Sequence, residues 1–278
     1  MNNLIFSLAV GASGLFAGLL GSLTGLGGGV VLVPLLSIAF GIDIRYAIGA
    51  SLISVIATSS GAAAAYVKEG YTNIRVGMFL EVATTIGALT GAFVAGLVSA
   101  NLISIVFGVV LLYSAYSSTR TIPQDLDSMT PDPLATRLRM NGTYPTSQGH
   151  KSYYVRGVPG GAGLMLIAGV LSGLLGIGSG ALKVIAMDKI MRIPFKVSTT
   201  TSNFMIGVTA AASAGVYLNR GYIAPGLAMP VMLGVLIGSL IGARILPRAK
   251  TQFLRYVFAA VIFAMAVEMF QKGIIGTT

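Results

Sequence analysis

Apolar stretches separated by short polar breaks make up most of this chain. A helix that crosses a ~30 Å hydrocarbon core needs about 20 residues, because it rises 1.5 Å per residue. Three stretches in each half reach that length, whereas 27–40, 178–191 and 160–175 are too short to cross comfortably. The pattern predicts an all-α polytopic membrane protein. The stretches run over 4–23, 27–40, 46–66, 76–98, 101–118, 160–175, 178–191, 197–218, 224–246 and 252–271.

The scarcity of charge supports the same fold class. Only 9% of the 278 residues are charged and 55% are hydrophobic, whereas soluble domains keep about a quarter of their residues charged. So little charge cannot cover an aqueous surface, so we expect most of the outer surface to face lipid. Met1 to Leu4 contain no basic residue ahead of the first apolar stretch, which predicts a membrane segment there and not a cleaved signal peptide.

The second half of the sequence repeats the first at a constant offset of 151 residues. A Gly-x-Gly-x-Gly pattern at 25–29 recurs at 176–180, and Gly-Tyr at 70–71 recurs at 221–222. Two different motifs in one register exceed what a glycine-rich composition produces by chance. We therefore predict membrane repeats at 1–118 and 159–278, joined by a polar linker at 119–158. Further matched pairs are Gly18 with Gly169, Ser51 with Ser202, Thr58 with Thr209, Tyr66 with Tyr217, Met78 with Met229, Gly87 with Gly238 and Gly91 with Gly242.

The basic residues predict how the two repeats are oriented. Basic loops remain on the cytoplasmic side of a membrane. The break near Ala100 has no charge, whereas its counterpart carries four basic residues between 244 and 255. If the linker is cytoplasmic and the loops alternate, 14 of the 18 basic residues lie inside, Arg45, Arg220 and Lys272 lie outside, and Lys183 lies within an apolar segment. This predicts inverted-topology repeats with both termini outside; the membrane we expect is the cytoplasmic membrane of a prokaryote.

Inverted repeats require an odd number of crossings in each half. Three long helices supply that number if the two leading segments of each half form a hairpin that enters and leaves on one side. Five crossings in each half also satisfy it. The short second segments favour a glycine-broken hairpin followed by three long transmembrane helices.

The glycine clusters at the two expected hairpin tips are candidate substrate-binding elements. Clustered glycine interrupts a helix and leaves backbone groups without intrahelical partners. In a bilayer such groups are tolerated where they are buried in protein or line a wet cavity, and paired interrupted segments often mark a transporter's central site. The alternative is that the glycines serve close helix packing. The tip residues are Gly25, Gly27, Gly28, Gly29, Gly176, Gly178, Ser179 and Gly180.

Polar residues near the start of the next helix in each half form a second candidate set. In the first half these are Ser51 and Ser54; in the second half they are Thr199, Thr200, Thr201, Ser202 and Asn203, of which Ser202 is the repeat equivalent of Ser51. Their hydroxyl and amide groups can donate hydrogen bonds to an oxyanion. The alternative is that they bond to their own helix or to neighbouring helices.

Lys183 and Glu81 are ionisable residues within apolar segments, where a charge is costly and marks a candidate functional residue. Lys183 follows the second glycine cluster, and we expect it to hold an anion, to extend to the cytoplasmic face, or to pair with Asp188. Glu81 lies six residues beyond Arg75 and is either a proton-coupling carboxylate or an interfacial partner of a basic side chain. Pairs of glycines at 14/18, 87/91 and 238/242 have the small-xxx-small spacing of helix packing.

Other function classes lack their residues. The sequence contains no Gly-x-x-x-x-Gly-Lys-Ser/Thr phosphate loop, so ATP hydrolysis by this chain is not expected. There is no cysteine, the single histidine, His150, lies in the polar linker, and no apolar segment carries paired carboxylates. We therefore expect no enzyme activity, no metal, no cofactor and no nucleic-acid partner.

The motifs resemble those of a known family. Gly-Leu-Gly-Gly-Gly at 25–29, Val-Leu-Val-Pro at 31–34 and Ala-Ile-Gly-Ala-Ser at 47–51 resemble the first half of the sulfite exporter TauE/SafE family of anion permeases. The second half is similar at 176–180, 201–204 and 219–223. The extended linker, and Ser179 where the family usually has glycine, depart from the common pattern.

The resemblance implies a secondary transporter that exports sulfite, sulfonates or related small organosulfur anions by alternating access. Its partners would be the anion, the lipid bilayer and a coupling proton or other ion. The alternative from the residues is an anion channel, or a permease for a different small anion, which could share every motif. The sequence leaves the exact substrate and the oligomeric state open.

Overall fold

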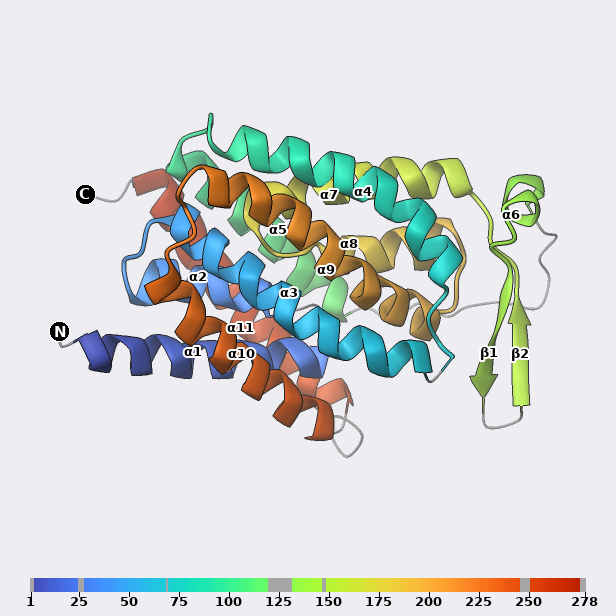
Figure 1. Ribbon diagram of the computed structural model, residues 1–278, viewed down its shortest axis with the longest axis horizontal. Coiled ribbons are helices and arrows are strands. Elements are labelled where there is room, and N and C mark those ends of the chain that lie inside the picture. The colour runs from blue at the N-terminus through green and yellow to red at the C-terminus, as the bar shows by residue number, and fades with distance from the viewer. Residues whose placement is uncertain are drawn as a thin grey trace.

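A computed structural model describes residues 3–24, 28–68, 70–119, 132–146, 149–245 and 251–275. The helices lie roughly along one common direction (Figure 1). Two helices, joined by a glycine-rich break, lead each half and are followed by three long helices. In the first half these are α1 (Asn3–Thr24), α2 (Gly29–Ala39), α3 (Ile44–Lys68), α4 (Ile74–Ala95) and α5 (Ala100–Thr119).

The second half has the same order of elements. Its short second helix ends in a π-helical turn, η1, where the chain makes one wider turn before it reaches the next break. The elements are α7 (Val158–Leu175), α8 (Gly180–Ile185), η1 (Ala186–Ile190), α9 (Phe195–Asn219), α10 (Pro225–Ile245) and α11 (Thr251–Ile275).

Within the described ranges, four helices are both long and apolar enough to cross a membrane. They are α1, α4, α7 and α10, and their presence supports a multi-pass membrane protein. The prediction that 160–175 is too short to cross was wrong, because α7 begins at Val158 and its 18 residues are long and apolar enough to span a membrane. Helices α3 and α9 are longer, at 25 residues each, but they are less apolar.

Equivalent breaks end α3 and α9. Gly70 and Gly221 each adopt a left-handed backbone conformation, with φ of +75° and +74°, which glycine adopts without steric cost. Asn73 then caps α4, because its side chain accepts a hydrogen bond from the Val76 N–H. Pro225 begins α10, a position where its missing N–H is harmless.

Glycines allow α1 to pack on α10 and α4 to pack on α7. A Cβ atom on Gly18 would collide with the backbone of Val235, and one on Gly91 would collide with the backbone of Val170. Gly14, Gly87, Gly238 and Gly242 are similarly close to the facing helix. The prediction that the small-xxx-small pairs serve helix packing is confirmed.

Helices α3 and α9 pack against each other in opposite directions. Gly49, near the start of α3, lies against Tyr222 just beyond the end of α9, whereas Ser59 lies against Gly207 in the middle of α9. Helices α5 and α11 are also antiparallel, since Gly108 lies against Phe270 and Gly273 lies against Ile105. By contrast, α1 runs parallel to α10, and α4 runs parallel to α7.

Contacts between the halves occur in pairs that differ by the repeat offset. The Arg45 guanidinium lies 5.7 Å from the centre of the Tyr222 ring, and the equivalent Lys196 ammonium lies 4.0 Å from the centre of the Tyr71 ring. Gly18 against Val235 likewise corresponds to Gly169 against Thr84. Each half therefore contacts the other through the same positions.

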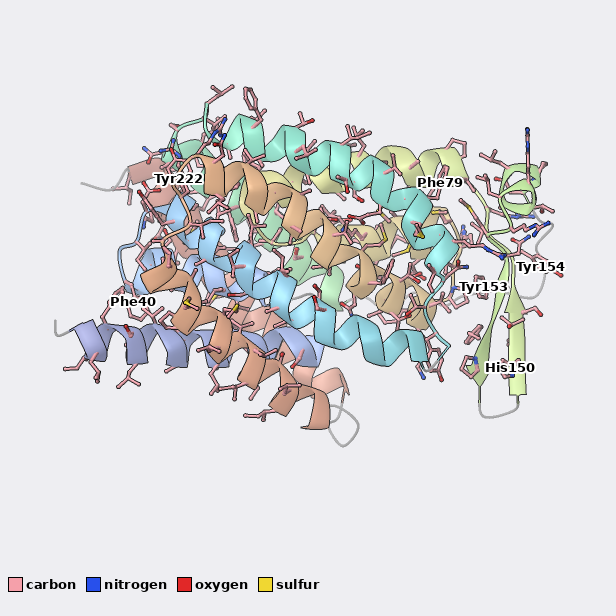
Figure 2. All side chains as sticks on the ribbon, viewed as in Figure 1. Phe40, Phe79, His150, Tyr153, Tyr154 and Tyr222 are labelled. Carbon is pink, nitrogen blue, oxygen red and sulfur yellow. The ribbon has the colours of Figure 1, made fainter. Side chains whose placement is uncertain are left out.

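The linker contains regular structure, which corrects the all-α expectation. It holds α6 (Pro133–Arg137) and an antiparallel hairpin of β1 (Gly142–Thr146) and β2 (Gly149–Tyr153). These elements, with His150, Tyr153 and Tyr154, lie at one end of the helices, and Phe40 and Tyr222 lie at the other (Figure 2).

Asn73 attaches this small unit to the membrane helices. Its amide nitrogen donates to the Met140 carbonyl and to the Tyr153 hydroxyl, each at 2.7 Å. Burial raises the pKa of the Tyr153 phenol, so the hydroxyl stays neutral and available as an acceptor. The Arg75 guanidinium also donates to the Arg139 carbonyl at 3.3 Å.

Candidate functional site

The first hairpin, α1–α2, returns to the end of the molecule from which it starts. The rings of Phe6 and Phe40 meet edge to face with their centres 6.1 Å apart, and Gly28 lies against Ala17. The Gly28 carbonyl accepts hydrogen bonds from the N–H groups of Val31 and Leu32, which begins α2. The candidate residues Gly25 and Gly27 fall outside the described residues.

The second hairpin, α7–α8–η1, also doubles back. The Arg156 N–H donates to the Met191 carbonyl at 3.1 Å, so the chain leaves η1 beside the start of α7. At its tip, Gly176, Gly178 and Ser179 all have positive φ, at +66°, +68° and +47°. This conformation suits glycine but strains serine by ~1 kcal/mol or more.

The two tips meet beside Ser51, in the first half of α3. The Ser51 hydroxyl donates to the Gly176 carbonyl at 2.8 Å. A Cβ atom on Gly29 would lie 2.6 Å from Ser51 Oγ and 2.9 Å from the Gly176 carbonyl oxygen. The equivalent Ser202 on α9 donates to the Gly180 carbonyl at 3.3 Å. The structure thus brings Gly29, Gly176, Gly180 and both repeat-related serines to the tips.

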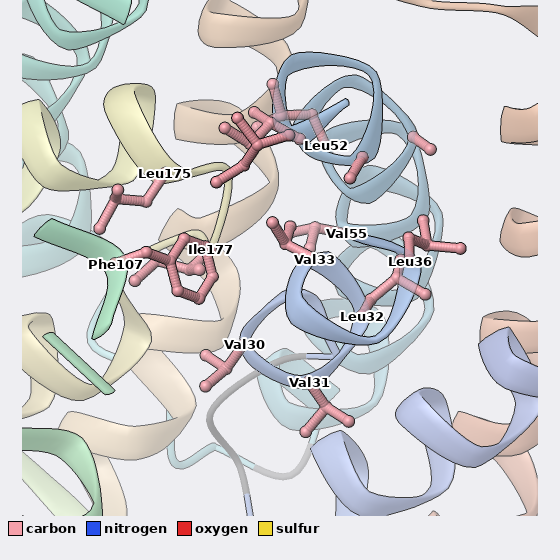
Figure 3. Packing of buried hydrophobic residues seen from close by; sticks show 14 of the residues in the cluster. Val30, Val31, Leu32, Val33, Leu36, Leu52, Val55, Phe107, Leu175 and Ile177 are labelled. Atoms are coloured by element: carbon pink, nitrogen blue, oxygen red, sulfur yellow. The ribbon is translucent and has the colours of Figure 1, made fainter. Parts of the chain in front are cut away.

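Apolar side chains enclose this region. Leu175 and Ile177 come from the second hairpin, and Leu52 and Val55 come from α3, all in one buried cluster (Figure 3). Val30 and Val33 of α2 belong to the same cluster. A polar group placed here is shielded from water, so its hydrogen bonds are strong when they are made and costly when they are not.

Two buried hydroxyls near the second tip have no hydrogen-bond partner among the described residues. They belong to Ser172, in the last turn of α7, and to Ser179. Both side chains are almost fully buried, at 0% and 2% exposed. Buried polar groups normally have hydrogen-bond partners, so each of these two hydroxyls is available to bind a ligand. A hydroxyl donor suits an anionic oxygen.

Most of the threonine cluster lies away from the tips. The Thr201 hydroxyl accepts from the Asn73 N–H at 3.0 Å, and the Thr200 hydroxyl donates to the Tyr71 carbonyl at 3.1 Å, both at the break between α3 and α4. Thr199 bonds to its own helix at Phe195, and Asn203 is half-buried. Ser54 also bonds to its own helix, at Ala50. Of this second candidate set, only Ser51 and Ser202 reach the tips.

Lys183 and Glu81 form an ion pair across the two halves. The Lys183 ammonium on α8 lies 3.7 Å from one carboxylate oxygen of Glu81 on α4. The Lys183 side chain is fully buried and Glu81 is only 8% exposed. Lys183 therefore does not extend to the cytoplasmic face, and Glu81 is not an exposed partner of Arg75.

The Thr209 hydroxyl on α9 links the two charges. Lys183 Nζ donates to Thr209 Oγ1, and Thr209 Oγ1 lies in turn 2.5 Å from Glu81 Oε1. Thr84 and Thr85 donate to the same carboxylate at 3.1 and 3.3 Å. Sequence reasoning did not select Thr209 as a site residue. Its position seven residues after Ser202, on the same face of α9, is the signal that could have found it.

Elsewhere the described residues offer little for metal chemistry. Among them, no group of three or more His, Asp or Glu side chains comes close enough together to hold a metal ion. The arrangement consists of hydroxyl donors, buried irregular backbone at the second tip and one buried ion pair. Those groups can bind a small anion and a proton.

Comparison with known proteins gives a consistent result. The chain is 27% identical to the probable membrane transporter protein YunE of Bacillus subtilis (strain 168) over 268 residues, which is 94% of this chain and 96% of that protein. It is 27% identical to the probable membrane transporter protein YjnA of the same organism, over 95% of this chain and 99% of that protein. For the probable membrane transporter protein MJ0441 of Methanocaldococcus jannaschii, the identity is 23%, over 92% of each chain.

No solved structure matches the chain. The family described as sulfite exporter TauE/SafE matches residues 10–269, nearly the whole sequence. The apolar helices and the relatives agree with that match. The chain therefore belongs to the sulfite exporter TauE/SafE family of membrane transporters.

Proposed function

We propose that the protein is a secondary transporter that exports sulfite, sulfonates or related small organosulfur anions by alternating access, with the anion held between the hairpin tips. The observation that carries this proposal is the meeting of the tips at Ser51 beside the unpartnered hydroxyls of Ser172 and Ser179. Oxyanions need several converging donors, and irregular backbone at membrane depth is tolerated where it serves such a site.

Inverted repeats are part of this proposal. Arg45 contacts Tyr222, and their repeat equivalents Lys196 and Tyr71 also contact each other. Such reciprocal contacts support a two-fold relation between the halves. Helices α3 and α9 are equivalent in the repeat and pack antiparallel, which supports an axis perpendicular to them. Such an axis lies in the membrane plane and is typical of transporters that alternate between an inward-open and an outward-open state.

The orientation follows from the charges. Arg75, Arg137, Arg139 and Lys196 lie at the linker end of the helices, whereas Arg45 lies at the opposite end. By the positive-inside tendency, this distribution supports a cytoplasmic linker and termini outside. For an exporter, the linker end is then the side from which the substrate enters.

Uptake into proteoliposomes tests the proposed function. Radiolabelled sulfite and methanesulfonate are supplied with and without an imposed pH gradient, and empty liposomes serve as the control. We expect saturable uptake of at least one anion. Folded protein that carries neither anion would contradict the sulfur-anion assignment and leave the fold untouched.

Ser172→Ala should lower the affinity for the anion and raise the stability of the substrate-free protein. The lost donor weakens binding by roughly 10- to 150-fold, because hydrogen bonds to charged groups contribute about 1.5–3 kcal/mol. An unpartnered buried hydroxyl destabilises the empty protein, so its removal increases the unfolding temperature. Transport KM and thermal unfolding in detergent measure the two effects.

Ser60→Ala on α3 is the matched control, because this exposed serine donates its hydrogen bond to the Ile56 carbonyl of its own helix. It should change neither KM nor stability by a measurable amount. A Ser172→Ala protein that is less stable but binds normally would show that this hydroxyl is structural.

A further inference from the structure

The buried ion pair is not required by the repeat. The positions equivalent to Lys183 and Glu81 in the other half are Leu32 and Met232, while Thr209 corresponds to Thr58. Leu32 is fully buried, so the fold accepts an apolar residue at this place. A pair of charges in only one half, at membrane depth, therefore calls for a functional explanation.

The pair adjoins the proposed anion site. The Lys183 N–H bonds to the Ser179 carbonyl at 3.0 Å, so the two residues are one helical turn apart on α8. Ser202 contacts Gly180 at the start of this turn, and Thr209 contacts Lys183 at its end. One face of α9 thus connects the hairpin tip to the ion pair. An anion at the unpartnered Ser179 hydroxyl would lie near the one buried ammonium in the described part of the chain.

Few other charges face Glu81. Helix α7, which packs on α4, has no ionisable side chain between Val158 and Leu175. On α9 the only charged residue is Lys196, whose ammonium lies over the Tyr71 ring. Arg75 bonds to the Arg139 carbonyl, and Asp188 and Lys189 follow in η1. The counter-charge recorded for the Glu81 carboxylate is Lys183.

We propose that Glu81, Thr209 and Lys183 form a proton-coupling site. The ionised Glu81 carboxylate pairs with the Lys183 ammonium, and protonation of Glu81 frees Lys183 to pair with the substrate anion. This inference rests on the proposed function. The Glu81 carboxylate takes up one proton from the aqueous side and becomes a neutral acid. The Lys183 ammonium then lacks a counter-charge, and one anion takes the place of the carboxylate. Loss of the proton restores the internal pair and expels the anion.

The cycle moves one proton and one anion in the same direction. For a singly charged anion it transfers no net charge, so flux should respond to a pH gradient and not to voltage. Export then proceeds where the outward anion gradient exceeds the opposing proton gradient. One proton accompanies each bound anion. The affinity for the anion should therefore weaken by up to 10-fold for each unit by which pH rises, over the range in which Glu81 is ionised in the empty protein.

Methanesulfonate is the appropriate probe because it remains a monoanion throughout the accessible pH range and carries no proton itself. Its binding to detergent-solubilised protein is measured by scintillation proximity between pH 5 and 9. Its flux is measured in proteoliposomes that contain a pH-sensitive dye. Wild-type protein should bind less tightly as pH rises and should move one proton with each anion.

Glu81→Gln mimics the protonated acid, so its affinity for methanesulfonate should be high and independent of pH. Its flux should lose the proton and become sensitive to voltage. Glu268→Gln, which neutralises an exposed carboxylate on α11, is the matched control and should keep the wild-type pH dependence. Glu81→Asp retains an ionisable group and should keep proton coupling at a reduced rate.

The outcomes separate the two claims. Saturable methanesulfonate flux without proton movement in the wild type, or flux driven by voltage, overturns the coupling site and leaves the transporter assignment intact. A Glu81→Gln protein that still binds with the wild-type pH dependence also overturns it. If Glu81→Gln does not fold, the wild-type proton-to-anion ratio and the Glu81→Asp variant still decide the question. Absence of any anion flux contradicts the proposed function itself.

Discussion

Replacing Lys183 with methionine should destabilise the protein by about 3–5 kcal/mol, because removal of one partner leaves an uncompensated buried charge. Methionine fills a similar volume, so the loss reflects charge and not a cavity. The Glu81 carboxylate would retain its hydroxyl donors Thr84, Thr85 and Thr209 but would lose its counter-charge. We expect the unfolding temperature in detergent to fall by on the order of 10 °C.

The double variant Lys183→Met, Glu81→Gln should recover most of this stability, because replacement of both members of a buried pair by neutral groups is often nearly neutral. Transport should remain absent in both variants, since neither presents a positive charge to the anion. A double variant as unstable as the single one would show that the pair is a structural element. Transport by Lys183→Met would show that the ammonium does not bind the anion.

Replacing Gly169 with leucine should prevent the protein from folding. A Cβ atom at this position would collide with the backbone of Thr84 on α4, and a backbone cannot rotate away as a side chain can. Overpacking by a single residue costs ~1–3 kcal/mol when side chains can adjust, so a larger loss is expected here. Size-exclusion chromatography of detergent-solubilised protein should show aggregate in place of a single folded peak.

Gly163→Leu on the same helix is the control. Nothing lies within 4 Å of a Cβ atom at Gly163, and the residue is exposed. Leucine is the better helix former by ~1 kcal/mol, so this variant should fold as well as the parent or better. Equal tolerance of leucine at both positions would contradict the close packing of α4 on α7.

The sequence predicts the order of the membrane helices well, because each helix and each break has an equivalent in the other half of the repeat. The break at Gly70-Tyr71 recurs at Gly221-Tyr222, so the same signal marks the C-terminal ends of α3 and α9. The linker has no counterpart in the repeat. Its strands and α6 were therefore missed, since a few residues between prolines show too little periodicity to predict a hairpin.

The candidate site was predicted less evenly. Thr201, Ser202 and Asn203 adjoin in sequence, but successive side chains on a helix point ~100° apart. Only Ser202 therefore faces α8, and Thr201 faces the break at Asn73. Glu81 and Lys183 belong to different halves, and no local pattern in the sequence joins residues so far apart. Their pairing follows from the packing of α4, α8 and α9.

The central claim is that a carrier site for a small organosulfur anion alternates between the two sides of the membrane, and counterflow tests it most directly. Proteoliposomes are loaded with a high concentration of unlabelled methanesulfonate and diluted into a trace of the labelled anion. The account predicts a transient accumulation of label above its equilibrium level, because each returning carrier exchanges its anion. Label that only equilibrates would indicate a channel and contradict the account.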